Sequence, residues 1–156
     1  RFRRLQTIRP MTDYIALGMM LLTAAMWAQF FAHMERDIIA QATITGNPVD
    51  HGELLMWRII ILGAAWLVVV LGAGLTWAAI PLATLTWAAF TIMHRFLLNR
   101  MRKHFPWWYV SPSNVYDRLW IGLTGGRVKA AGIAAYCFEI TTLAASVGAY
   151  IWIVNT

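Results

Sequence analysis

Long apolar stretches separated by charged segments dominate the pattern of the chain. Residues 14–33 contain no Lys, Arg, Asp or Glu, and residues 130–154 contain only one such residue, Glu139. A helix of about 20 residues, rising about 1.5 Å per residue, matches the thickness of a bilayer core, about 30 Å. The pattern therefore predicts a membrane helix at about 14–33 and another at about 130–154.

The central apolar stretch is longer than one membrane helix requires. Residues 59–93 form a run of 35 positions without a formal charge, which as one helix would measure about 52 Å. Gly72-Ala73-Gly74 near its middle can form a tight turn, and Pro81 lacks a backbone donor and can begin or kink a helix. We expect two helices, at about 56–73 and 77–98. One long helix is the alternative, and it would give three crossings instead of four.

The segments between the apolar stretches differ in charge. Residues 1–13 are basic, whereas residues 34–57 are polar and acidic and contain the turn signal Gly46-Asn47-Pro48. Residues 99–129 form a basic loop. Within it, Ser113 or Asn114 can cap a short amphipathic helix on the membrane surface, which a Gly125-Gly126 pair would end.

Composition restricts the class of protein. Hydrophobic residues make up 60% of the 156 positions and charged residues 13%, against about 45–50% and about 25% in soluble domains. We predict an all-α, polytopic integral membrane protein with a single membrane domain over residues 1–156. The lone Cys137 excludes an internal disulfide, and we expect the net charge of +6 to reflect membrane topology and not nucleic-acid binding.

The basic residues also predict an orientation. Residues 95–129 hold seven Lys or Arg, and such clusters remain on the cytoplasmic side. We therefore expect this loop to face the cytoplasm of a bacterial inner-membrane protein, with the C-terminus on the opposite side. The side of the N-terminus depends on whether the chain crosses three or four times.

Glu139 is the strongest single candidate for a functional residue. An ionised carboxylate about ten residues into a membrane helix costs several kcal/mol unless it is protonated or paired. Glu139 is thus an intramembrane polar residue in a proton relay or ligand site, or a structural partner of Arg58, Arg95, a threonine or another subunit. The sequence favours the structural interpretation, because no second intramembrane acid continues a relay.

Cofactor and metal signals are weak. His33 and His94 lie at predicted helix ends and are the candidates for binding a haem between helices. Met residues are abundant, but Met commonly fills apolar helix surfaces. We expect no cofactor, no metal site and no catalytic residues, because the chain has no Gly-rich phosphate loop and no nucleophile beside a base.

Two sets of residues predict contacts with other molecules. The last helix carries small residues four apart, which allow close helix approach in lipid: Ala131 with Ala135, and Ala144 with Gly148. Basic and aromatic side chains in or just before the loop favour lipid headgroups or a partner surface: Arg95, Arg100, Arg102, Lys103, Trp107, Trp108, Arg118 and Trp120. The expected partners are the bilayer, other membrane subunits and anionic lipid headgroups.

Residues 116–130 have the form R-L-x-x-x-L-x-G-x-R-x-x-A from Arg118 onward. This stretch resembles the cytoplasmic tail of small inner-membrane subunits of conjugation and type IV secretion systems, and no functional residue is carried over from it. We expect a non-enzymatic subunit that anchors and packs partner helices in a larger membrane complex. The alternatives are a membrane anchor contacting haem, quinone or pigment, and a small proton-coupled transporter using Glu139.

Overall fold

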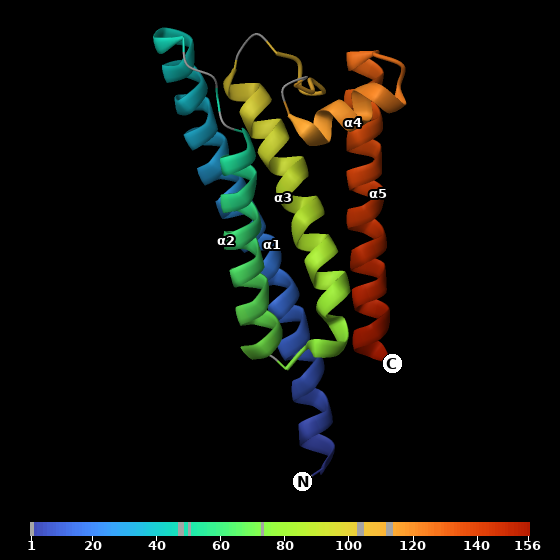
Figure 1. Ribbon diagram of the computed structural model, residues 1–156. Coiled ribbons are helices and arrows are strands. Elements are labelled where there is room, and N and C mark those ends of the chain that lie inside the picture. Colours follow the sequence, from blue (N-terminus) through green and yellow to red (C-terminus); the bar gives the residue numbers. More distant parts are fainter. Residues whose placement is uncertain (1, 47–48, 50, 73, 103–104, 112–113) are drawn as a thin grey trace.

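The computed structural model describes residues 2–46, 49, 51–72, 74–102, 105–111 and 114–156, with the backbone alone for 2–12, 51, 76 and 115. Over these residues the chain is helical, with no strand, which confirms the predicted all-α class (Figure 1). The elements are α1 (Phe2–Thr45), α2 (His51–Gly72), the 3-10 turn η1 (Thr76–Ala78), α3 (Ala79–Met101), α4 (Val115–Leu123) and α5 (Val128–Asn155).

The first helix is far longer than predicted. The expectation of a helix over 14–33 followed by a polar loop over 34–57 is wrong, because α1 continues to Thr45 and α2 already begins at His51. The polar residues after position 33 continue the helix with the same pattern of backbone hydrogen bonds. α1 ends only at Gly46, which has a φ of 74°, a conformation that glycine adopts without steric cost at a helix C-terminus.

The central apolar stretch forms the predicted helical hairpin, with α2 and α3 running antiparallel (Figure 1). Gly74, with a φ of 67°, turns the chain, and the amide of Leu75 donates to the carbonyl of Val70 at 2.8 Å. Trp66 of α2 donates its indole N–H to the carbonyl of Ala79 at 2.9 Å. Consequently α1 begins and α5 ends at the same end of the bundle (Figure 1).

Within the described residues, three segments are long and apolar enough to cross a membrane: Asp13–Thr45, Gly52–Gly72 and Val128–Asn155. α3 is outside this set although its 23 residues are long enough. Its composition is less apolar than that of the three spanning segments, and α3 is packed against α1, α2 and α5.

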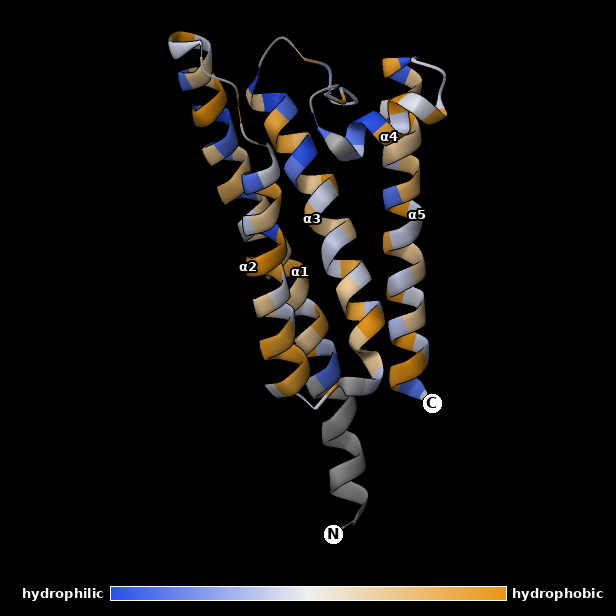
Figure 2. Cartoon of the chain, viewed as in Figure 1, coloured by the Kyte–Doolittle hydropathy of each residue, from blue (hydrophilic) through white to orange (hydrophobic). Residues whose placement is uncertain are grey.

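The interior is built from α3 against the flanking helices. Towards the end where α5 finishes, Met20 of α1, Leu82 of α3 and Tyr150 of α5 are fully buried together. Tyr150 also donates its hydroxyl to the carbonyl of Asp13 at 2.7 Å, which ties α5 to α1. A second cluster nearer the opposite end includes Phe31 and Phe90. Polar residues gather at the end that carries α4, above this apolar interior (Figure 2).

The short helix α4 lies across that polar end of the bundle, against α5 (Figure 1). Its apolar side chains point outward, with Leu119 and Leu123 exposed by 58% and 69%, whereas Asp117 points inward and is buried. A helix with an outward apolar face suits the boundary between headgroups and acyl chains. Gly125 and Gly126, both with positive φ, follow its end as predicted.

Asn114 caps α4, as its position in the sequence predicts, by accepting a hydrogen bond from the amide of Tyr116 at 3.0 Å; Ser113 lies outside the described residues. Replacing Asn114 by alanine should lower the free energy of unfolding by about 1 kcal/mol, because the amide loses its acceptor. Denaturant titration monitored by circular dichroism in detergent micelles would measure this. Asn114→Asp, which keeps an acceptor, is the control, and equal losses in the two variants would contradict the assignment.

Candidate functional site

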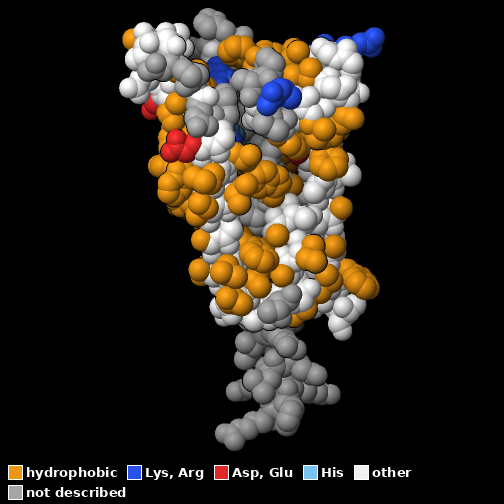
Figure 3. All heavy atoms as spheres, viewed as in Figure 1, with side chains coloured by type: hydrophobic (Ala, Val, Ile, Leu, Met, Phe, Trp, Pro, Cys, Tyr) orange, Lys and Arg blue, Asp and Glu red, His pale blue; other side chains and the backbone are white. Residues whose placement is uncertain are grey.

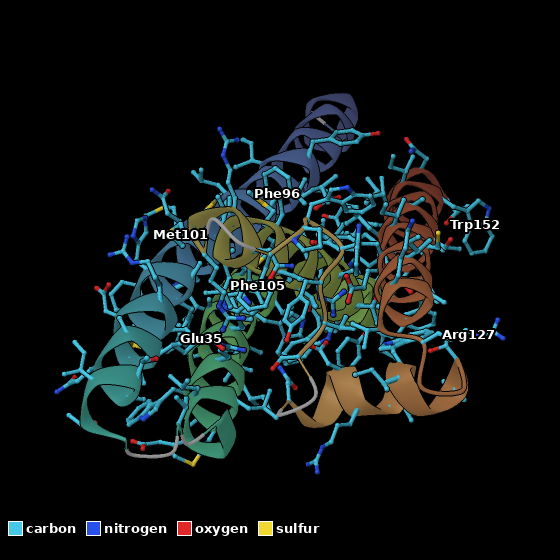
Figure 4. All side chains as sticks on the ribbon, turned by 90° about the horizontal axis from the view of Figure 1, so that it is seen from above. Glu35, Phe96, Met101, Phe105, Arg127 and Trp152 are labelled. Atoms are coloured by element: carbon cyan, nitrogen blue, oxygen red, sulfur yellow. The ribbon has the colours of Figure 1, made fainter. Side chains whose placement is uncertain are left out.

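A buried polar cluster lies at the end of the bundle that carries α4. It brings together ionisable side chains from α1, α2, α3, α4 and α5, each exposed by less than a tenth. The members of this polar cluster are Glu35, Arg58, His94, Arg95, Asp117 and Glu139. Seen from above, Glu35 points into the space enclosed by α1, α2 and α3 (Figure 4).

Glu35, Arg58 and His94 form the first half of the polar cluster. Arg58 donates from Nη2 to Oε2 of Glu35, and Nε2 of His94 lies 3.1 Å from the same oxygen and 3.2 Å from Nη2 of Arg58. A protonated Nε2 donates to Glu35, whereas an unprotonated Nε2 accepts from Arg58. His94 can thus satisfy either neighbour by changing its tautomer.

Aromatic rings enclose this half of the polar cluster. The guanidinium of Arg58 lies 5.7 Å from the ring centroid of Phe31, and the imidazole of His94 stacks on Phe90 with centroids 5.4 Å apart. Burial beside these rings strengthens the attraction between the charges but makes an unpaired charge costly.

Arg95, the residue after His94, organises the second half. Its guanidinium lies 3.3 Å from a carboxylate oxygen of Asp117 and 3.0 Å from one of Glu139. Tyr116 donates a hydrogen bond from its hydroxyl to Glu139, the second of these acids, at 3.1 Å. The rings of Tyr116 and Tyr136 lie over the guanidinium, at 5.6 and 5.1 Å. Arg95 therefore joins α3 to both α4 and α5.

The segment 105–111 packs against α3 and α5 through its backbone. Asn99 donates to the carbonyls of Trp107 at 3.0 Å and Tyr109 at 2.9 Å, and Tyr136 also donates to Trp107 at 3.0 Å. Gly132 of α5 makes this approach possible, because a β-carbon there would lie only 1.7 Å from the carbonyl oxygen of Trp108. A side chain at position 132 of α5 would therefore have no room beside this segment.

Burial shifts the ionisation of the residues on α4. It raises the pKa of the Asp117 carboxyl, against the charge of Arg95 and a hydrogen bond from the amide of Ser111, 2.8 Å away. It also raises the pKa of the Tyr116 phenol, an effect that the negative charge of Glu139 reinforces. Tyr116 therefore keeps its proton at neutral pH and remains a donor to Glu139.

A small cavity of about 80 Å³ opens between the two halves of the polar cluster, and Glu35, Arg58, His94, Arg95 and Asp117 contribute to its walls. Arg102, at the end of α3, lines it as well. The Nε atoms of Arg58 and Arg102 are buried and have no hydrogen-bond partner within the described part of the chain. Arg58, Arg95 and Arg102 thus place three guanidinium groups around the cavity.

The structure separates the two histidines that were candidates for haem. His94 is buried and bound to Glu35 and Arg58, whereas His33 is exposed on α1. Across the described ranges, no group of three His, Cys, Asp or Glu side chains is placed to hold a metal ion. Glu139 contacts Arg95, one of the structural partners considered for it, and Tyr116.

The fold buries one of the residues predicted to contact lipid headgroups and leaves others exposed or half-buried. Arg95 is buried in the polar cluster and is not at the surface. Arg100, Trp107 and Arg118 are exposed, while three others are half-buried, namely Arg102, Trp108 and Trp120. Lys103 lies outside the described residues.

The small residues of α5 likewise differ in their burial. Ala131 and Ala135 are fully buried within the bundle, beside Gly132. Ala144 and Gly148 are exposed, and a β-carbon at position 148 would meet nothing within 4 Å. The first pair therefore packs inside this chain, and the second faces outward.

Sequence reasoning did not single out Asp117, Asn99 or Gly132, and it did not predict the ion pair of Glu35. Glu35 was assigned to a polar loop, because the helix was expected to end before it. A signal was nevertheless present, since Arg58 and His94 flank the central apolar stretch, and a charge near a membrane segment needs a partner.

Comparison with known protein families, curated proteins and solved structures finds no match to this chain.

Proposed function

We propose that the protein is a non-enzymatic, membrane-embedded subunit that holds partner helices in a larger complex. The observation that carries the proposal is an outward patch of small residues on α5, the α5 patch, formed by Ala144, Ala145, Gly148 and Ala149, all exposed. Small residues let two helix backbones approach closely in lipid, where packing and not hydrophobicity drives association.

The shape of the surface beside the α5 patch supports a partner helix. A depression of about 420 Å³ between α3 and α5 is lined by Ala145 and Ala149 together with Ile80 and Pro81. Large apolar side chains of a neighbouring helix could enter it, as knobs do in helix packing. Trp152, exposed by 69%, lies one turn further along α5 and points away from the bundle (Figure 4).

The overall distribution of side chains supports a location in the bilayer. Hydrophobic side chains cover the middle and lower part of the face shown in Figure 3, whereas charged ones lie near the upper end. Only 17% of the spanning window of α5 and 22% of that of α2 is buried inside the chain, so lipid or other subunits must cover the rest. We infer a bacterial inner membrane with the 95–129 loop in the cytoplasm, because basic loops remain there.

The contacts of the polar cluster favour this role over the alternatives. Glu139 is held between Arg95 and Tyr116, which suits a structural tie better than a proton carrier that must release its proton. His94 is occupied by Glu35 and Arg58, which does not favour haem ligation. Among larger complexes, the resemblance of residues 116–130 favours a conjugation or type IV secretion machine.

Filling the α5 patch should release the subunit from its complex. In Gly148→Leu, the new side chain points into open space in the isolated chain but occupies the volume where a partner backbone would approach. Blue-native electrophoresis of membranes solubilised in digitonin should show the intact chain well above its own mass of 17.7 kDa. The variant should migrate near the monomer with unchanged helix content.

Gly18→Leu is the matched control, because Gly18 on α1 is also exposed with open space around its α-carbon. It should migrate with the intact chain. A monomeric intact chain, or a complex that survives in Gly148→Leu, would refute the proposal.

A further inference from the structure

We propose that the polar cavity and an adjoining apolar groove together bind one anionic phospholipid. The headgroup phosphate would lie at Arg58 and Arg102, and an acyl chain would lie between α2 and α3. This inference is independent of the proposed partner helix, since different substitutions test the groove and the α5 patch.

The cavity has the chemistry of a phosphate site. Arg58 has a side chain exposed by only 9%, and its Nε, like that of Arg102, is buried without a partner among the residues described. Guanidinium N–H groups only donate, and phosphate oxygens accept short, charge-assisted bonds from them. A cavity of about 80 Å³ admits a group of a few heavy atoms and excludes a whole lipid.

The wall of the cavity carries more cations than acids, because Glu139 is not part of it. Arg95 is matched by Asp117 and Glu139, and Arg58 is matched by Glu35. Arg102 forms no ion pair in the described part of the chain; its guanidinium instead lies 5.7 Å from the ring of Phe105. In the wall of the cavity, therefore, the three guanidiniums of Arg58, Arg95 and Arg102 stand against the two carboxylates of Glu35 and Asp117, and a phosphodiester with one negative charge balances them.

The apolar groove continues from this cavity. It has a volume of about 370 Å³ and runs between α2 and α3, with Trp66 and Gly63 on one side and Ala83 on the other. Trp87 lines both the cavity and the groove. Leu55 lines the cavity and Ile59, one turn further along α2, lines the groove.

The walls of the groove suit an acyl chain. Thr84 and Thr86 contribute to it, but their hydroxyls donate to the carbonyls of Ile80 and Leu82, at 3.1 and 2.7 Å. These two satisfied hydroxyls leave their part of the surface effectively apolar. The groove also lies towards the middle of the bundle from the cavity, so a lipid would be bound with its headgroup at the polar end, the orientation it has in a bilayer.

Lipid binding can be measured by native mass spectrometry of the purified chain in dodecyl maltoside. Dioleoylphosphatidylglycerol should bind first as one molecule per chain, about tenfold more tightly than dioleoylphosphatidylcholine. Arg102→Gln should weaken phosphatidylglycerol binding about tenfold. Gly63→Leu should weaken it by a similar factor, because a β-carbon there meets nothing within 4 Å and the leucine fills the groove without disturbing the fold.

Two variants serve as matched controls. Arg100→Gln removes an equal charge from an exposed position on the same helix, and Gly18→Leu adds the same side chain on α1; both should bind phosphatidylglycerol like the intact chain. Equal losses in Arg100→Gln and Arg102→Gln would show only a general surface attraction and would overturn the proposal. Unchanged binding in Gly63→Leu would also overturn it.

Discussion

Replacing Arg95 by glutamine is expected to lower the free energy of unfolding by about 3–5 kcal/mol, the cost of breaking a buried ion pair from one side. The guanidinium lies within 3.3 Å of Asp117 and within 3.0 Å of Glu139, and both acids are exposed by less than a tenth. Without Arg95, two buried carboxylates face each other with no cation between them. Titration with sodium dodecyl sulfate in mixed micelles, followed by circular dichroism, would measure the loss.

A second substitution tests whether the unpaired acids cause the loss. Adding Glu139→Gln to the Arg95→Gln variant should restore about 1–2 kcal/mol, because residues in one ion-pair network are coupled. Arg100→Gln, at an exposed site, should change stability by less than about 0.5 kcal/mol. If Arg95→Gln behaved like Arg100→Gln, the buried ion pairs would not hold α4 and α5 to α3.

The smallest possible enlargement at Gly132 should cost about 3 kcal/mol. In Gly132→Ala the new methyl group would lie 1.7 Å from the carbonyl oxygen of Trp108, far inside van der Waals contact. The obstacle is backbone, so no rotamer change can relieve it. Segment 105–111 would have to move away, and the hydrogen bonds that Asn99 and Tyr136 donate to the Trp107 carbonyl would stretch.

Gly148→Ala on the same helix is the matched control for this prediction. Its methyl group meets nothing within 4 Å, and alanine is the better helix former by up to about 1 kcal/mol. The two variants should therefore shift thermal unfolding in detergent in opposite directions. A Gly132→Ala protein as stable as the intact chain would contradict the close approach of segment 105–111 to α5.

The helices that could be predicted from the sequence are those whose boundaries coincide with a change in polarity. The turn at Gly72–Gly74 lies within an apolar run too long for one crossing, and Asn114 marks the start of α4, so both were found. The end of α1 was missed because its last turns are polar while remaining helical. Hydropathy depends on what surrounds a helix, whereas the helix itself ends only where the backbone leaves helical dihedral angles, here at Gly46 with its positive φ.

The polar cluster could be anticipated only in part. The need for a partner near Glu139 follows from the cost of burying a charge, and Arg95 was among the partners considered. That Asp117 shares the same arginine depends on how α4 lies across the bundle, which no local pattern encodes. The close approach at Gly132 likewise depends on a loop whose path is set by distant hydrogen bonds from Asn99 and Tyr136.

The adjacency of His94 and Arg95 on α3 has a consequence for biosynthesis. His94 meets its partners among helices that are made earlier, whereas Arg95 meets Asp117 and Glu139 only after they are translated, the second of them 44 residues later. At about 5–20 residues per second this delay is several seconds. Until Asp117 is translated, 22 residues after Arg95, neither of the acids that bind Arg95 in the folded chain exists, so its long side chain must reach for the headgroups in the meantime.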